Sequence, residues 1–174
     1  MNLFDNNTGA EFSQDGKYRY KLWRIWDEKL PKAMCIGLNP STANADTNDP
    51  TINNLQRILS KLGYGGFYMM NCFAWITSDP KLLKHNPMSD EWNNNMITVI
   101  AGLCDEVIFA WGNFDIIREL GRDKELEEMF PNAKCFGKNK NGTPCHPLAL
   151  MYNGTVNSPK LYEYANKKTI THGV

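Results

Sequence analysis

The chain lacks a surplus of charge of either sign, because 19 Lys and Arg offset 19 Asp and Glu among its 174 residues. Proteins that hold nucleic acid through charge alone are usually basic, so any DNA binding here has to use a local patch. The sequence also lacks an apolar run long enough to cross a membrane, and it does not open with a signal peptide. We therefore expect a cytoplasmic protein that does not enter a membrane.

Metal and nucleotide-cofactor motifs are missing as well. The five cysteines are widely spaced and none forms a C-x-x-C pair, which argues against a zinc or iron–sulfur site. Neither G-x-G-x-x-G nor G-x-x-x-x-G-K-[ST] occurs, and no nucleophilic serine lies in a G-x-S-x-G elbow. The sequence therefore predicts a protein that uses no metal ion and no organic cofactor.

What the sequence does contain is an alternation of strand-like and helix-like segments. Strands are predicted at 17–26, 33–38, 65–75, 106–112 and 133–137, and helices at 50–62, 90–103 and 114–130. Asp49 and Pro50 are suited to begin the first helix, and Ser158 and Pro159 to begin a last one. In the second helix the apolar residues expected to face inward are Trp92, Met96, Val99, Ile100 and Leu103.

This alternation is typical of α/β folds. The chain is long enough to form a hydrophobic core, and we predict one domain over residues 1–174, with residues 1–16 as a loose N-terminal arm. The predicted fold class is a three-layer α/β/α sandwich with a central, mostly parallel sheet of four to five strands.

Polar residues follow the predicted strands where those strands end. Asn39 comes after "AMCIGL", Asn71 ends the run "FYMMN", and His146 follows the last strand. Because the carboxyl ends of parallel strands share one rim, we expect these side chains to converge where a ligand binds. An amide both donates and accepts hydrogen bonds, which suits it to the polar edge of a base.

Four motifs, in this order, resemble those of the uracil-DNA glycosylase superfamily: "GLNPS", "FYMMNCFAW", "VIFAWGN" and "HPLAL". The resemblance covers about residues 33–165, and it is strongest to the thymine-mismatch and single-strand-selective branches, which carry G-x-N-P-G. The longer string "GLNPSTAN…DPTI" also looks like a family of bacterial and phage proteins without an assigned function.

The resemblance implies a monofunctional DNA glycosylase that hydrolyses the N-glycosidic bond of a flipped-out pyrimidine and leaves an abasic site. Asn39 would hold the attacking water, and His146 would donate a hydrogen bond to the pyrimidine oxygen that gains negative charge. Asn71 would read the edge of the base. The other substrate-binding residues that the resemblance implies are Gly37, Leu38, Pro40, Ser41 and Phe73, and the residues implied as a wedge into DNA are Leu148, Leu150 and Met151.

Two departures from the superfamily refine this expectation. The most active members have Asp where this chain has Asn39, which predicts slower chemistry or a base that leaves easily. Uracil-specific members have a bulky Tyr where this chain has Ser41, so we expect a 5-substituted or mismatched pyrimidine, such as thymine or a modified base of phage DNA. The implied partner is double- or single-stranded DNA, bound by a monomer.

Each of these residues also has a plainer interpretation. Asn39 and Ser41 can end a strand and cap a helix, Asn71 can satisfy loop backbone, and Phe73 can belong to the core. Asp49 can cap the first helix or act as a general base. Two further functions stay open: hydrolysis or transfer on a free nucleoside or nucleotide, which zero net charge favours, and a non-catalytic module that binds modified bases.

Overall fold

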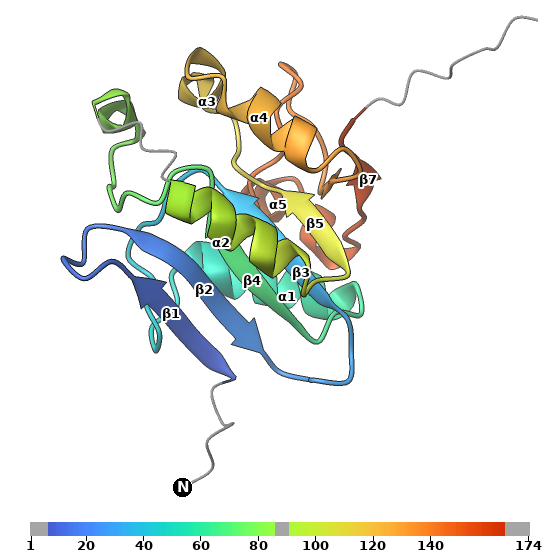
Figure 1. Cartoon of the computed structure of the whole chain (residues 1–174). Coiled ribbons are helices and arrows are strands. Elements are labelled where there is room, and N and C mark those ends of the chain that lie inside the picture. The colour runs from blue at the N-terminus through green and yellow to red at the C-terminus, as the bar shows by residue number, and fades with distance from the viewer. Residues whose placement is uncertain (1–6, 86–90, 166–174) are drawn as a thin grey trace, which may run out of the picture.

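A single mixed sheet forms the centre of the protein. The computed structural model describes residues 7–85 and 91–165. Within them the sheet has seven strands in the order β1-β2-β4-β3-β5-β6-β7 (Figure 1). Their bounds are β1 (Thr8–Phe12), β2 (Arg19–Ile25), β3 (Lys32–Gly37), β4 (Gly66–Asn71), β5 (Glu106–Phe109), β6 (Lys134–Cys135) and β7 (Tyr162–Glu163).

The prediction of a mostly parallel sheet with four to five strands is wrong. The sheet has seven strands, and three of its six pairings, β1 with β2, β2 with β4 and β6 with β7, are antiparallel. The pairings of β3 with β4, β3 with β5 and β5 with β6 are parallel. β1 and β2 are joined by a tight turn in which the Ser13 amide donates to the Tyr18 carbonyl at 2.9 Å, and a connection this short requires antiparallel strands.

Both ends of the chain differ from the prediction. Thr8–Phe12 are not a loose arm, because they form β1 on the edge of the sheet. Gly9 in this strand is required by the packing, because a Cβ added there would overlap the Trp23 ring on β2. The last helix predicted from Ser158 is also wrong, because Tyr162–Glu163 pair with β6 as β7. Residues 1–6 and 166–174 lie outside the described residues.

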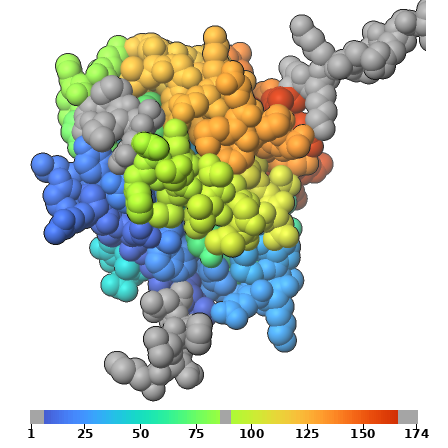
Figure 2. All heavy atoms as spheres, viewed as in Figure 1, coloured from blue at the N-terminus to red at the C-terminus, as the bar shows by residue number. Residues whose placement is uncertain are grey.

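Helices cover both faces of the sheet. The α-helices are α1 (Pro50–Lys61), α2 (Glu91–Ala101), α3 (Asp115–Glu119), α4 (Arg122–Met129) and α5 (Ala149–Tyr152), with 3-10 turns at η1 (Pro80–Lys84) and η2 (Thr155–Asn157). In Figure 1, α2 lies in front of the sheet and α1 behind it. Figure 2 shows that α2 and the α3–α4 segment cover the front face. Within the described residues, no helix combines the length and the apolar composition needed to span a membrane.

The two faces of the sheet have separate cores. Behind the sheet, Ile52, Leu55, Ile58 and Leu59 of α1 belong to one buried apolar cluster with side chains of β3 and β4. In front, α2, α3 and α4 contribute to a second cluster around Met34, Ile36 and Met70. The alternating side-chain directions of β3 and β4 produce this division, since neighbouring residues of a strand point to opposite faces.

The two larger helices differ in how well the sequence predicted them. The predicted start of α1 is confirmed, because the Asp49 side chain caps it by accepting from the Ile52 amide at 2.9 Å. The predicted inward face of α2 is confirmed for Ile100, which is buried, and Met96 packs partly buried against the core. It is wrong for Trp92, which is 54% exposed, and for Val99 and Leu103, which are also exposed. Asn93 and Ile97, which were not predicted, are buried as well, and the polar Asn93 finds hydrogen-bond partners at the end of β4.

Candidate functional site

A cavity of about 420 Å³ lies at the carboxyl ends of the parallel strands. Its walls come from β2, from the ends of β3 and β4, from the segment after β5 and from the loop that precedes α5. The lining residues that bear on chemistry are Arg19, Leu38, Asn39, Ser41, Asp49, Asn71, Trp111, Phe114, His146 and Leu148. Asn39, Asn71 and His146, which the sequence placed at strand ends, therefore line the same cavity.

Asn71 is a buried amide without a partner. It is 1% exposed, and neither its Nδ2 nor its Oδ1 has a hydrogen-bond partner among the described residues. Gly37 is its register partner on β3, and a Cβ at Gly37 would lie 3.1 Å from Oδ1 and 2.5 Å from the Met69 terminal carbon. A buried, unsatisfied polar group costs about 1–3 kcal/mol. A polar ligand in the cavity would remove this cost.

A second layer of polar residues holds the backbone on either side of this amide. The Asn93 side chain donates to the Asn71 carbonyl at 3.1 Å, and Arg122 Nε donates to the Cys72 carbonyl at 2.9 Å. Arg122 is itself held by Asn94 Oδ1 at 2.6 Å and by the Glu125 carboxylate, also at 2.6 Å. The end of β4 is thus fixed from α2 and α4, and the position of the Asn71 side chain follows from it.

Asn39 presents an oxygen acceptor, because its amide nitrogen is already used. Nδ2 donates to the Thr77 carbonyl at 2.7 Å and to the Pro40 carbonyl at 3.1 Å. These bonds fix the orientation of the amide plane and leave Oδ1 as the atom that can accept from a ligand or a water molecule. The side chain is half-buried at the wall of the cavity.

His146 is held as a neutral donor. Its Nδ1 accepts from the Leu148 amide at 3.2 Å, so the proton of the neutral imidazole lies on Nε2. Burial lowers the pKa of His146 below its ordinary value, and the negative charge of Asp49 partly opposes this shift. Gly112 makes room for the ring: its φ is +83°, and a Cβ there would lie 3.1 Å from the His146 Cβ.

Asp49 combines its role as a helix cap with a place in the cavity wall. Oδ1 accepts from the Ile52 amide at 2.9 Å, and Oδ2 accepts from the Ser41 hydroxyl at 3.3 Å. Both residues line the cavity, and Ser41 is exposed. Asp49 can therefore cap the helix and act in the cavity at the same time. It supplies the cavity with a carboxylate, whereas the motif "GLNPS" supplies only the amide of Asn39.

Among the residues of the cavity wall that the sequence did not predict are Arg19 and Phe114. Arg19 lies at the start of β2 and is 2% exposed, and Phe114 lies just after the Trp111-Gly112 turn. In the run "KYRYKLWRIW" the cations alternate with aromatic residues, so nothing in the pattern separates a buried arginine from a solvated one. Trp111 is fully buried and also lines the cavity; its Nε1 has no partner among the described residues.

Several predicted site residues lie elsewhere. Pro40 and Phe73 do not line the cavity, and Phe73 is a fully buried core residue beside Ile36 and Met70. Leu150 was predicted as a DNA wedge, which is wrong because it is 2% exposed in the core behind the sheet. A wedge has to reach out of the protein.

The other two wedge candidates do lie at the surface or at the cavity. Leu148 lines the cavity, and Met151 is 50% exposed on α5. The next residue, Tyr152, is 90% exposed and was not predicted. An exposed apolar end of α5 therefore follows the cavity wall directly in the chain.

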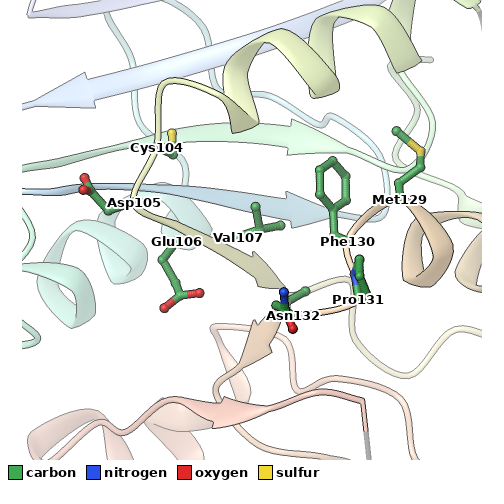
Figure 3. A pocket seen from close by; sticks show the side chains of 9 residues that line it. Cys104, Asp105, Glu106, Val107, Met129, Phe130, Pro131 and Asn132 are labelled. Carbon is green, nitrogen blue, oxygen red and sulfur yellow. The ribbon is translucent and has the colours of Figure 1, made fainter. Parts of the chain in front are cut away.

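Another cavity, of about 290 Å³, lies at the opposite edge of the sheet (Figure 3). Cys104–Val107, at the start of β5, and Met129–Ala133, before β6, line it. It is at the amino ends of the parallel strands, where open α/β sheets do not usually bind ligands. Within the described residues, no group of three His, Cys, Asp or Glu is arranged to hold a metal ion.

Fold and site together define a mixed α/β protein with a polar cavity at the carboxyl ends of its parallel strands. Residues 19–148 match a family described as a protein of unknown function, DUF1643, and the chain belongs to this family. The matched span begins at Arg19 and ends at Leu148, and both residues line the cavity. No curated protein and no solved structure matches the chain.

The burial of neighbouring residues on α5 leads to a first prediction. We expect Leu150→Ala to lower the free energy of unfolding by about 2–5 kcal/mol, because it opens a hole in the core. Met151→Ala, the matched control on the same helix, should change it by less than about 0.5 kcal/mol. Urea unfolding followed by circular dichroism measures both values. Equal losses in the two variants would contradict the placement of α5.

A second prediction concerns the protonation of His146. A histidine titration followed by NMR, with His146→Gln to assign the signal, should give His146 a pKa below the ordinary 6.5. Because the unfolded chain then binds a proton more readily than the folded one, stability should fall as the pH drops below about 6.5. Asp49→Asn should lower the pKa further, since the carboxylate raises it. A pKa at or above 6.5 would refute the neutral donor.

Proposed function

We propose that the chain is a monofunctional DNA glycosylase that hydrolyses the N-glycosidic bond of a flipped-out pyrimidine, either 5-substituted or mismatched, and leaves an abasic site. The observation that carries the proposal is the buried amide of Asn71, which lines a cavity and has neither its donor nor its acceptor satisfied by any residue that the structure describes. The edge of a pyrimidine offers a matching acceptor and donor side by side.

His146 supports the departure of the base. When the bond between C1′ and N1 breaks, its electron pair stays on the base and the negative charge spreads to the carbonyl oxygens of the base. A neutral imidazole with its proton on Nε2 can donate to the oxygen that gains this charge. Since Nδ1 is already bonded to the Leu148 amide, the ring does not need to change its tautomer during the reaction.

Asn39 and Asp49 support the attack of water. The Asn39 Oδ1 can orient a water molecule, but an amide does not take its proton. The Asp49 carboxylate lines the same cavity and is the base to which that proton can go. In this step the water oxygen bonds to C1′, the proton passes to Asp49, and the base leaves with the electrons of the broken bond.

The size of the cavity favours a substituted base. Even at the ~30 Å³ that one water molecule occupies in the liquid, the eight non-hydrogen atoms of uracil need only about 240 Å³. The cavity measures about 420 Å³, and the small, exposed Ser41 lies in its wall. A methyl group or a larger substituent on C5 therefore has room.

One other function has an observation in its favour. With 19 basic and 19 acidic side chains the chain has no net charge to attract DNA, which favours hydrolysis of a free nucleoside or nucleotide. The exposed Met151 and Tyr152, which follow the cavity-lining Leu148 in the chain, favour DNA instead, because exposed apolar side chains can replace a flipped base in the stack.

Mass spectrometry of the bases released from a panel of oligonucleotides, phage-modified DNAs and free nucleosides tests the proposal. We expect release of a 5-substituted or mismatched pyrimidine from DNA at a higher rate than uracil from a matched duplex. Asn39→Ala and His146→Ala should each slow this release at least about 100-fold with an unchanged circular dichroism spectrum. His85→Ala, which changes an exposed histidine, is the control. Release from nucleosides alone would favour the alternative function.

The two roles of Asp49 can be separated by substitution. Asn caps helices as well as Asp does, so Asp49→Asn should unfold at nearly the same urea concentration as the unsubstituted protein. It should nevertheless release base at least about 100-fold more slowly, because the proton acceptor is gone. Asp49→Ala should lose about 1 kcal/mol of stability in addition. An active Asp49→Asn variant would show that Asp49 is only a cap.

A further inference from the structure

Arg19 brings a full positive charge to the cavity. Among the described residues that line it, Arg19 is the only lysine or arginine. The guanidinium is 2% exposed, and burial lowers its pKa to about 10, a shift that Asp49 opposes and Arg24 reinforces. The group therefore stays charged at neutral pH. His146 is neutral there, so the cavity has one formal cation.

The hydrogen bonds of Arg19 leave part of its guanidinium free for a ligand. Nη1 donates to the Ala43 carbonyl at 2.7 Å, whereas the buried Nε has no partner among the described residues. Arg24, on the same strand, is also buried but binds Asn48, Asn44, Gly9 and Trp23 through Nε, Nη1 and Nη2, and it does not line the cavity. These hydrogen bonds use every donor nitrogen of Arg24 and explain why it is buried. Those of Arg19 leave its Nε unused.

Asp49 does not neutralise Arg19 by direct contact. Its two oxygens accept from the Ile52 amide and the Ser41 hydroxyl, and within the described residues no ion pair joins it to Arg19. The cavity thus holds a cation and an anion that are not paired with each other. Cleavage of an N-glycosidic bond creates the same two charges, a negative one on the base and a positive one on the sugar.

We propose that Arg19 is a catalytic residue that binds the departing base and stabilises the negative charge that the base acquires. The inference rests on the proposed glycosylase function. As the C1′–N1 bond breaks, its electron pair moves onto N1 and the carbonyl oxygens of the base, and Nε–H of Arg19 donates to one of these atoms. The positive charge left on the sugar is removed when the water oxygen bonds to C1′ and the water proton passes to Asp49.

A series of leaving groups tests this role. 5-Fluorouracil leaves more easily than uracil, and uracil more easily than thymine. In an enzyme that does not stabilise the leaving group, the rate of base release therefore differs more strongly between these bases. Arg19→Gln should therefore slow the release of thymine about tenfold more than the release of 5-fluorouracil from the same duplex. Arg24→Gln, the matched control, should affect all three bases equally. An equal loss for all three bases in Arg19→Gln would show that Arg19 only supports the structure.

A binding experiment separates a failure of this inference from a failure of the proposed function. Barbiturate is a pyrimidine that is an anion at neutral pH, and calorimetry should show that it binds at least about tenfold more tightly than uracil. Arg19→Gln should lose this preference and Arg24→Gln should keep it. If this pattern holds but no DNA or nucleoside releases a base, the anion site stands and the glycosylase proposal falls. If bases are released but the barbiturate preference is absent, the role of Arg19 is refuted alone.

Discussion

The site depends on a steric constraint at the end of the β3–β4 pairing. Gly37 and Asn71 are register partners, and the missing side chain at position 37 leaves the space that the Asn71 amide occupies. The fold therefore carries a buried polar group that no other described residue satisfies, in surroundings of low dielectric where such a group is costly. Asn93 and Arg122 hold the backbone on either side of this amide through the Asn71 and Cys72 carbonyls.

The part of the site that lies at strand ends was predictable from the sequence. Asn39 follows the apolar run that forms β3, Asn71 ends the one that forms β4, and His146 comes after β6 and a polar loop. The rule for parallel strands brings the carboxyl ends of such strands to one edge. This rule applied because β3, β4 and β5 are parallel neighbours, even though the whole sheet is mixed. The roles of these residues in catalysis stay predictions.

The parts that the sequence did not predict depend on tertiary packing. Arg19 and Asn93 are polar residues in segments whose pattern indicates a solvated face, and they are buried because other segments supply their partners. Leu150 and Met151 are adjacent, and the direction in which α5 packs decides which of them is buried. β1 was missed because a short polar strand at an edge gains its stability from a neighbour rather than from its own composition.

The two arginines of β2 also fix the loop that forms part of the cavity wall. Their guanidinium groups bond to the carbonyls of Ala43 and Asn44, and so attach the loop between β3 and α1 to the sheet. A wall that is ordered in advance spares an incoming molecule the conformational entropy of ordering it. Preorganisation of this kind favours a nearly rigid pocket that selects its ligand by shape, rather than a loop that closes over whatever enters.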